Sequence, residues 1–456
     1  MPIEARAYPR PLPNAAWLER LTEEILEPGL PIVDPHHHLW DHPGSRYLLD
    51  DLVADVNSGH NIVATVFIQC GSGYRTSGPE EMRPIGESEF VRRIAEEGDR
   101  RGGKTKICAG IVSFADLRLA NVDAVLEGQI AAAGGRFRGI RHIAASDPAI
   151  IGASSYVPPP GLMDDPNFRR GLKRLPAHDL TFEAWIYHPQ LKSLIEVARE
   201  CPDVKIVLNH FGGPLGVGPY RRDEVFPGWR ADMKALAACP NVYVKLGGLA
   251  MIVNAFDFHL LPLPPSSGAM ADAWRPYVEA AIENFGANRC MFESNFPVDK
   301  GACSYPVLWN AFKRLASGAS AFGKGRSFRR HRIAVLPAVR FFALTLHASR
   351  ARQDLRRAAP RRGRLGSPLR AWRARRAFGA ATLASVIAIF RCSSRPVRRR
   401  AMGSAGRPLS WLRSSSVLRL RRWRGLPRSS RRLTCSQAGQ GTRSSSRRLR
   451  RRSASE

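Results

Sequence analysis

The chain has 456 residues, and its 70 Lys and Arg against 39 Asp and Glu give a formal net charge of +31. This length suits two ordinary domains or one large barrel with additions. Residues 321–456 hold 36 Arg and one Lys against Asp354 and Glu456, a net of +35, which leaves residues 1–320 at −4. The composition therefore excludes a uniformly basic nucleic-acid-binding protein and divides the chain near residue 320.

The eight cysteines stand apart, without a CxxC pair. In a chain of this length they favour reduced thiols and a cytoplasmic location. The N-terminus lacks an apolar run of signal-peptide type. The most apolar stretch of the tail, 378–390, is shorter than the ~20 residues needed to cross a bilayer, so we predict no membrane partner.

From residue 31 onward, short apolar runs alternate with helical patterns, which favours a distorted (β/α)8 TIM barrel over 31–320. An open, doubly wound sheet is the alternative. Residues 1–30 are expected to form an N-terminal arm. The predicted strands are 32–40, 62–70, 107–114, 137–144, 180–187, 205–212, 242–248 and 290–297. The predicted helices are 87–101, 122–133, 166–175, 190–200, 229–238, 271–285 and 306–316.

Histidines cluster at the predicted strand ends. His36 and His38 lie two residues apart on the first strand, so their side chains share one face. Two imidazoles that converge at a barrel mouth typically bind a divalent metal, although a solvated polar stretch is the alternative. His188 follows the fifth strand and His210 ends the sixth, while His142 lies late in the fourth. The long connections 150–166 and 254–270 would border the same mouth.

Five motifs occur in a characteristic order. They are Asp34-x-His36-x-His38-Leu-Trp40, Gly139-Ile-Arg141-His142, Asn209-His210-Phe-Gly, Lys245-Leu-Gly-Gly and Phe292-Glu-Ser-Asn-Phe-Pro297. Together they resemble the amidohydrolase-related branch of the amidohydrolase superfamily, which contains lactonases and, more distantly, aromatic-acid decarboxylases. The resemblance covers about residues 30–318 and implies a barrel with its site at the carboxyl ends of the strands. It also implies a divalent metal, zinc or manganese, with His36, His38, His188 and His210 as ligand or substrate-binding positions.

The last motif departs from the family pattern. Asn295 stands where the resemblance implies an aspartate that binds metal and acts as general base. An amide can neither accept a proton from water nor neutralise metal charge, so a metal-independent hydrolase, in which the histidines and Arg141 stabilise a developing oxyanion, is the alternative. Glu293, with the same strand parity, or Asp299 in the following loop could supply the carboxylate. The predicted catalytic residues are therefore His36, His38, His210, Glu293, Asn295 and Asp299.

Cationic and aromatic side chains near the mouth are predicted to bind substrate. Arg141 and Lys245 suit a carboxylate, and His142 is counted with them. A salt bridge to Glu183 is the equally weighted alternative for the two cations. Trp40 would wall the pocket or simply pack at the strand end.

The Arg-rich tail, 321–456, has a composition unlike working nucleic-acid-binding tails, because Arg outnumbers Lys 36 to 1. Back-translating residues 321–337 and shifting the frame by one nucleotide permits the peptide SEKADLFAGTASRFYR, which resembles a closing helix of the family's barrel. We therefore interpret the tail as a frameshifted, disordered, low-complexity segment. The alternative is an extension that binds RNA or DNA.

Together these features predict a hydrolase that acts on a lactone or similar cyclic ester of a small carboxylated substrate. A decarboxylase on the same barrel is one alternative, and an inactive barrel with a nucleic-acid-binding tail is another. Nucleic acid is otherwise not expected as a partner, and a homo-oligomer stays open.

Overall fold

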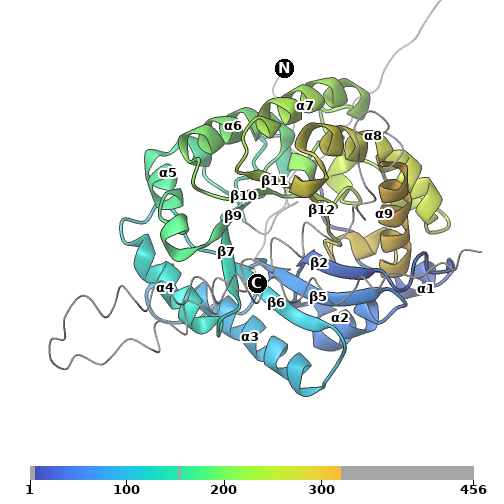
Figure 1. Ribbon diagram of the computed structural model, residues 1–456, viewed down its shortest axis with the longest axis horizontal. Helices are drawn as coiled ribbons and strands as arrows, with labels where there is room; N and C mark the ends of the chain where they lie inside the picture. The colour runs from blue at the N-terminus through green and yellow to red at the C-terminus, as the bar shows by residue number, and fades with distance from the viewer. Residues whose placement is uncertain (1–5, 152–155, 320–456) are drawn as a thin grey trace, which may run out of the picture. The chain divides into compact units, whose positions relative to one another are not determined.

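The computed structural model describes residues 6–151 and 156–319. Its main sheet has eight parallel strands in the order β12-β11-β10-β9-β7-β6-β5-β2 (Figure 1). Their bounds are β2 Pro31–His37, β5 Asn61–Ile68, β6 Lys106–Ser113, β7 Phe137–Arg141, β9 Thr181–Ala184, β10 Ile206–Leu208, β11 Val242–Leu246 and β12 Cys290–Phe292. All eight predicted strands are confirmed, although each ends earlier than its apolar run.

The first and last strands meet just beyond the end of β12. The His38 amide donates to the Phe296 carbonyl at 2.7 Å, and the Asn295 amide donates to the His36 carbonyl at 2.9 Å. A parallel bridge also joins His37 to Phe296. These contacts close the sheet into a TIM barrel and exclude the open, doubly wound alternative. On the other side of β2, a register shift between Asp34 and His37 makes its pairing with β5 irregular.

Helices surround the strands, as Figure 1 shows. They are α2 Leu49–Val56, α3 Ile85–Arg100, α4 Val122–Ala132, α5 Pro166–Leu172, α6 Leu191–Glu200, α7 Arg222–Ala237, α8 Ser267–Phe285 and α9 Tyr305–Ala319. Seven match predicted helices, and α2 was not predicted. None of the described helices combines the length and apolar character that a membrane crossing needs.

The barrel interior is filled by small apolar side chains from five strands. They are Val33, Val66, Ile68, Val112, Val207 and Met291, and each is at most 8% exposed. A larger cluster packs between the strands and the outer helices. These six side chains make the middle of the barrel apolar. The polar residues of the site lie instead at the carboxyl ends of the strands.

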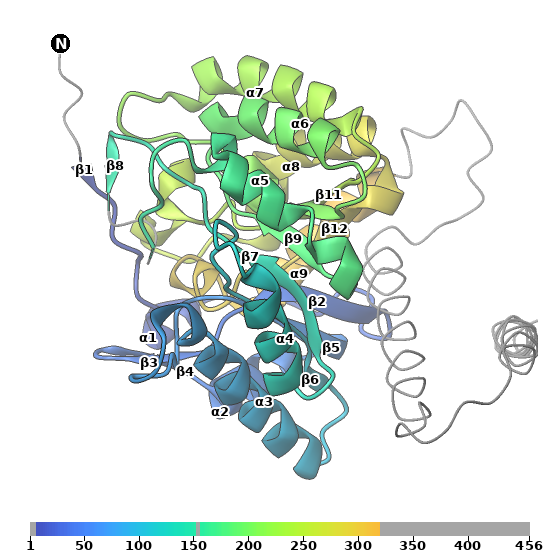
Figure 2. The same cartoon turned by 90° about the vertical axis from the view of Figure 1, so that its left-hand side faces the viewer.

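Two short pairings lie outside the barrel. Trp40 does not end the first strand but begins β3 (Trp40–His42), which forms an antiparallel hairpin with β4 (Ser45–Tyr47). In the N-terminal arm, β1 (Arg6–Ala7) pairs in parallel with β8 (Ile150–Ile151), as Figure 2 shows, and α1 (Ala15–Leu18) follows. The arm is therefore attached to the loop after β7. The predictions for the tail fall outside the described residues.

Candidate active site

Five polar side chains meet at the carboxyl ends of the strands. His36 lies on β2 and His38 directly follows it, while His210 begins the turn after β10. Glu293 and Asn295 follow β12 within three residues. None of the five is more than 3% exposed. The structure thus brings together five of the six residues predicted to be catalytic.

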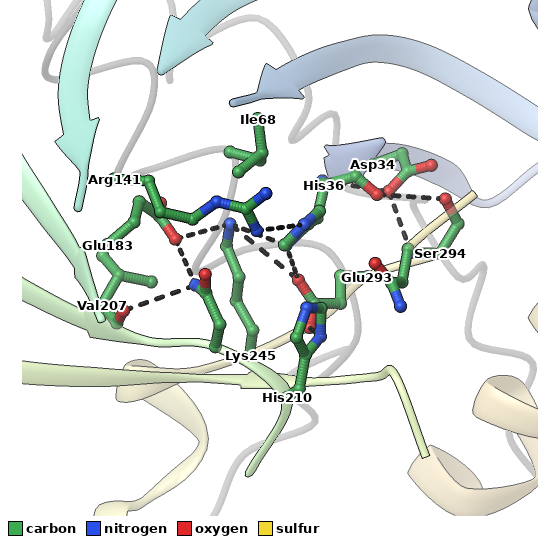
Figure 3. A network of polar contacts seen from close by, with 12 residues as sticks. Asp34, His36, Ile68, Arg141, Glu183, Val207, His210, Lys245, Glu293 and Ser294 are labelled. Atoms are coloured by element: carbon green, nitrogen blue, oxygen red, sulfur yellow. Dashed lines mark hydrogen bonds and ion pairs between the residues drawn. The ribbon is translucent and has the colours of Figure 1, made fainter. Parts of the chain in front are cut away.

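The carboxylate of Glu293 lies between two histidine rings. Its Oε2 is 2.6 Å from His36 Nδ1, and its Oε1 is 2.7 Å from His210 Nδ1 (Figure 3). Among the described residues, none forms an aligned hydrogen bond with either carboxylate oxygen or with His210 Nδ1, although all three atoms are buried. Buried polar atoms without aligned partners are costly. The group can therefore gain free energy by binding a cation.

The ring nitrogens of His36 and His38 point to the same conclusion. His38 Nδ1 lies 2.8 Å from the Ile68 carbonyl oxygen, so it carries the proton and leaves a lone pair on Nε2. That Nε2 is 3.2 Å from His36 Nε2. If His36 is protonated on Nδ1, two lone pairs face each other. If it is protonated on Nε2, its Nδ1 lone pair faces Glu293 at 2.6 Å. Either tautomer brings two acceptors together. A divalent cation bound between them would remove the repulsion between their lone pairs.

Asn295 adds a third acceptor to this group. Its Nδ2 donates to Asp299 Oδ1 at 2.9 Å, which turns its Oδ1 toward His38 Nε2 at 3.3 Å. Asp299 therefore contacts Asn295 rather than the histidines. Burial raises the pKa of Asp299 to about 8. Asp299 thus orients the amide, while Glu293 is the carboxylate that meets the histidines.

The histidines are held in their neutral form. Burial lowers the pKa of His36 well below its usual value, and the nearby Lys245 ammonium adds to this effect. Burial likewise lowers the pKa of His38, with a contribution from Arg141. Neutral imidazoles keep a lone pair, which is the form that binds metals and accepts protons.

Lys245, on β11, does not reach the mouth. Its Nζ lies 2.8 Å from Glu183 Oε2 and 3.4 Å from His36 Nδ1, and the residue is fully buried. Asn209 also donates to Glu183 Oε2. The salt bridge considered as an alternative for Lys245 is therefore formed, and the expected substrate carboxylate lacks access to this cation. Figure 3 shows this layer beside the histidines.

Arg141, at the end of β7, is held by Gln69, which directly follows β5. Its Nε donates to Gln69 Oε1 at 3.3 Å, and its Nη2 donates to the Gln69 carbonyl. Its Nη1 lies 3.4 Å from His36 Nε2. Gln69 was missed in the sequence because an isolated glutamine after a strand has no distinctive pattern.

The sequence profile of the Amidohydrolase family matches residues 33–342. The chain belongs to this family. The match confirms the resemblance seen in the five motifs, and it extends past the predicted boundary at residue 320. The family assignment makes this chain an amidohydrolase-type enzyme.

The proteins similar to this chain include three from Sinorhizobium and Burkholderia. The protein y4mH of Sinorhizobium fredii, named as uncharacterized, is 34% identical over 319 residues, covering 65% of this chain and 95% of that protein. An L-fucono-1,5-lactonase of Burkholderia ambifaria is 29% identical over 241 residues, covering 50% and 72%. A crystal structure of a Burkholderia multivorans amidohydrolase with bound zinc is 23% identical, with a TM-score of 0.52, and covers 69% of this chain and 99% of that one. The last likeness supports the amidohydrolase barrel fold.

Two predicted residues of this amidohydrolase lie apart from the cluster. His188 begins a turn after β9, where its Nδ1 accepts the Leu215 amide at 3.2 Å and its ring packs against Tyr220 at 5.2 Å. His142 is enclosed by aromatic rings, with its Nε2 3.3 Å from the Tyr156 hydroxyl. His188 Nδ1 and His142 Nε2 thus each have a local partner, and neither histidine contacts the cluster around Glu293.

A cavity of about 390 Å³ opens onto the cluster. His38, His210, Asn295 and Arg141 line it from the barrel. Trp40 also lines it, with its ring 5.8 Å from that of His38. The remaining lining includes Tyr8, Pro9, Arg10 and Pro11 of the N-terminal arm, together with Trp185. The arm's contribution was missed, because nothing in its sequence indicates where it returns to the barrel.

Backbone conformation also marks the site. His210 and Asn295 adopt positive φ angles of 51° and 55°, which side chains other than glycine rarely occupy. Gly248 follows β11, and a Cβ there would lie 2.4 Å from His210 Nδ1. Such backbone strain concentrates at functional sites. The turn after β10 therefore places the His210 ring against Glu293 at a cost in backbone free energy.

Proposed function

We propose that this amidohydrolase is a hydrolase that opens a lactone, or a similar cyclic ester, of a small carboxylated substrate. The observation that carries the proposal is the convergence of His36, His38 and His210 around the buried Glu293, at a cavity lined by cationic side chains. Similarity to an L-fucono-1,5-lactonase supports the same reaction class.

We assign the general base to His210. Its Nδ1 faces Glu293 at 2.7 Å and its ring lines the cavity, which leaves Nε2 to accept a proton. A water oxygen adds to the ester carbonyl carbon while His210 Nε2 takes the water's proton. The ring C–O bond then breaks, the proton passes to the leaving alkoxide, and a hydroxy acid results. Glu293 orients His210 and stabilises the imidazolium that forms.

Arg141 is assigned to the negative charge that develops on the carbonyl oxygen. Its guanidinium is fixed through two donors to Gln69, and its Nη1 remains directed toward the histidines. A preorganised donor of this kind stabilises an oxyanion more than water does. The same side chain lines the cavity, where the ester would lie.

The residues present fit a divalent metal ion. The 3.2 Å between the Nε2 atoms of His36 and His38 is close to the separation expected for two ligands of one zinc ion, roughly 3.3 Å for tetrahedral bonds of about 2.0 Å. Asn295 Oδ1 adjoins this pair. His36, His210 and Glu293 also bring one ligand atom each within 4.8 Å of one another. We favour the Nε2 pair, because the 2.6 Å contact to Glu293 suits a carboxylate that orients a ligand histidine.

When bound, a zinc or manganese ion there would polarise the carbonyl and lower the pKa of a bound water. His188, placed apart, is not retained in this proposed ligand set. The zinc of the Burkholderia multivorans amidohydrolase is consistent with the choice of metal.

The test is acid release from a panel of five- and six-membered lactones, with and without a free carboxylate, in a pH-stat. His210→Asn should lower kcat/KM by about 10²–10⁴-fold, as expected for loss of a general base. His188→Asn is the matched control, because it removes an imidazole outside the cluster, and its kcat/KM should stay within threefold of the parent.

Three results would contradict the proposal. Equal losses in the two histidine variants would place the base elsewhere. Carbon dioxide release from aromatic acids, without lactone opening, would favour the decarboxylase. Absence of both activities, with salt-sensitive nucleic-acid binding that disappears in a 1–320 truncation, would favour the inactive barrel.

A further inference from the structure

The N-terminal arm places an arginine in the active-site cavity. Tyr8 is 7% exposed and packs in a cluster with Ile143 and Trp185. Three residues later, the Pro11 carbonyl lies so close to Gly301 that a Cβ there would meet it at 2.4 Å. The arm is therefore fastened on both sides of Arg10, and all four residues 8–11 line the cavity.

Arg10 is held but not neutralised. Its guanidinium carbon lies 4.1 Å from the centroid of the Trp40 ring. Its Nη2 donates to Ser45 Oγ at 3.3 Å, and the same oxygen accepts from Trp40 Nε1 at 3.1 Å. These contacts fix the plane of the guanidinium and use one of its five N–H donors. The Arg10 Nε is buried without a hydrogen-bond partner among the described residues.

The charged side chains that line the cavity around Arg10 are all positive. Within the described part of the chain, no carboxylate lies within ion-pair distance of Arg10. The described lining of the cavity holds two arginines, Arg10 and Arg141, and neither Asp nor Glu. A half-buried cation that meets no anion among the described residues is costly to keep. Its free donors and its position in the cavity suit an anion supplied by a ligand.

The two basic residues that the sequence suggested for a carboxylate, Arg141 and Lys245, already contact other side chains of the barrel. Lys245 is fully buried against Glu183. Arg141 is bound to Gln69 and directed toward His36. Arg10 stacks on Trp40, whose ring lies 5.8 Å from that of His38. It is therefore one aromatic ring removed from the proposed reaction centre.

We propose that Arg10 binds a free carboxylate of the substrate, at the end remote from the ester that is opened. The inference rests on the proposed lactone hydrolysis and assigns the residue that binds the carboxylate of its substrate, so that the products of the reaction are dicarboxylates. The guanidinium of Arg10 binds the carboxylate through two N–H donors, and the face of the Trp40 ring packs against the guanidinium. Because the arm fixes the position of Arg10 in the cavity, Arg10 is a specificity-determining residue.

Equilibrium binding of two unbranched acids tests the assignment without requiring catalysis. Adipate carries two carboxylates, and 6-hydroxyhexanoate replaces one of them with a hydroxymethyl group. By isothermal titration calorimetry at constant ionic strength, the parent chain should bind adipate at least tenfold more tightly. Arg10→Met keeps an apolar stem over Trp40 and should reduce this preference to less than threefold. Arg10→Lys should give an intermediate preference, because the charge remains and the fork is lost.

Two controls separate the site from general electrostatics and from damage to the fold. Arg46→Met removes a positive charge from the exposed hairpin strand β4 and should keep the tenfold preference. Gly301→Ala should displace the arm at Pro11 and reduce the preference although Arg10 is present. Gly103→Ala is its matched control, since a Cβ there meets nothing within 4 Å.

Equal affinity of the parent chain for both acids, or binding of neither, overturns the assignment. So does an Arg10→Met chain that keeps the tenfold preference. These outcomes are distinct from failure of the proposed function. A chain that binds adipate through Arg10 but opens no lactone contradicts the hydrolase proposal alone. An active lactonase that does not distinguish the two acids contradicts only the role of Arg10.

Discussion

The two ends of the barrel each bury a histidine beside a charged side chain, and they differ in how the polar atoms are satisfied. At the end where the strands begin, His60 Nε2 donates to the Pro306 carbonyl at 3.0 Å. Its Nδ1 accepts from Lys313 Nζ at 2.8 Å, and Lys313 also donates to the Leu26 and Glu27 carbonyls. Donors and acceptors match at this end, so the cluster joins α9 to the arm and to β5.

At the carboxyl end, acceptors face acceptors. His38 Nε2 meets His36 Nε2 and Asn295 Oδ1, and the Glu293 oxygens lie 2.6 and 2.7 Å from two histidine rings without an aligned hydrogen bond among the described residues. A matched cluster lowers the free energy of the fold, whereas an unmatched one is retained where a ligand or a reaction completes it. Each end buries a histidine, so burial of the imidazole alone does not separate a structural histidine from a functional one, and the hydrogen-bond pattern supplies the distinction.

The largest expected effect is from His36→Ala at the unmatched end. It removes a proposed metal ligand and one of the two rings on Glu293, so we expect a loss of kcat/KM of about 10³-fold or more and a loss of bound zinc. Zinc per chain, measured by plasma emission spectrometry after equilibrium dialysis, should fall from one to below 0.1. Unchanged zinc content with full activity would remove His36 from the site.

The pairing of Asn295 with Asp299 can be tested by exchange. Asn295→Asp replaces a donor that lies 2.9 Å from Asp299 Oδ1 with a second carboxylate, so we expect a loss of about 1–3 kcal/mol in the free energy of unfolding. The double variant Asn295→Asp/Asp299→Asn restores one amide and one carboxylate and should recover most of that loss in urea denaturation. Additive losses would show that the two residues are not coupled.

The matched end predicts a pH dependence of stability. Burial lowers the pKa of His60 to about 4, from an ordinary value of 6.5. A base whose pKa is lowered by folding contributes stability above pH 6.5 and loses it as the pH falls toward 4. The stability difference between the parent and His60→Gln should therefore shrink between pH 6.5 and 4 in urea denaturation. If the difference in free energy of unfolding between the two chains does not change with pH, folding does not lower the pKa of His60.

The smallest expected effect concerns the tail, where we propose that 321–456 arises from a shifted reading frame. A chain in which SEKADLFAGTASRFYR follows residue 321 and replaces the present tail should melt a few degrees higher, about 1 kcal/mol in free energy. Equal melting temperatures would count against a closing helix. Sequencing of the gene and its transcript provides the independent check, because an intact frame in both would exclude the frameshift.

Much of the fold could be predicted because parallel strands covered by helices form long apolar runs. All eight barrel strands were recognised in this way. The hairpin that begins at Trp40 and the helix Leu49–Val56 were missed, because they lie in a short polar stretch after the first strand. Closure of the barrel through His38 and Phe296 depends on contacts between the two ends of the domain, which periodicity does not reveal.

Site residues could be predicted where strand parity and position combine. Parity placed His36 with His38 and Glu293 with Asn295, and all four meet in the structure. Position at a strand end alone was a weaker guide. His188 follows β9, but its Nδ1 is used by the Leu215 amide, and such local partners are invisible in a sequence.

The most direct test of the contrast between the two ends measures activity and stability together in Glu293→Gln and Lys313→Met. This contrast predicts that Glu293→Gln loses at least 10²-fold in kcat/KM for lactone opening while its free energy of unfolding changes by less than about 1 kcal/mol, because a buried carboxylate without an aligned hydrogen bond among the described residues is replaced by an amide of the same shape. It predicts that Lys313→Met keeps kcat/KM within threefold and loses about 1–3 kcal/mol of stability. Full lactonase activity in Glu293→Gln, or a larger loss of activity in Lys313→Met, would contradict it.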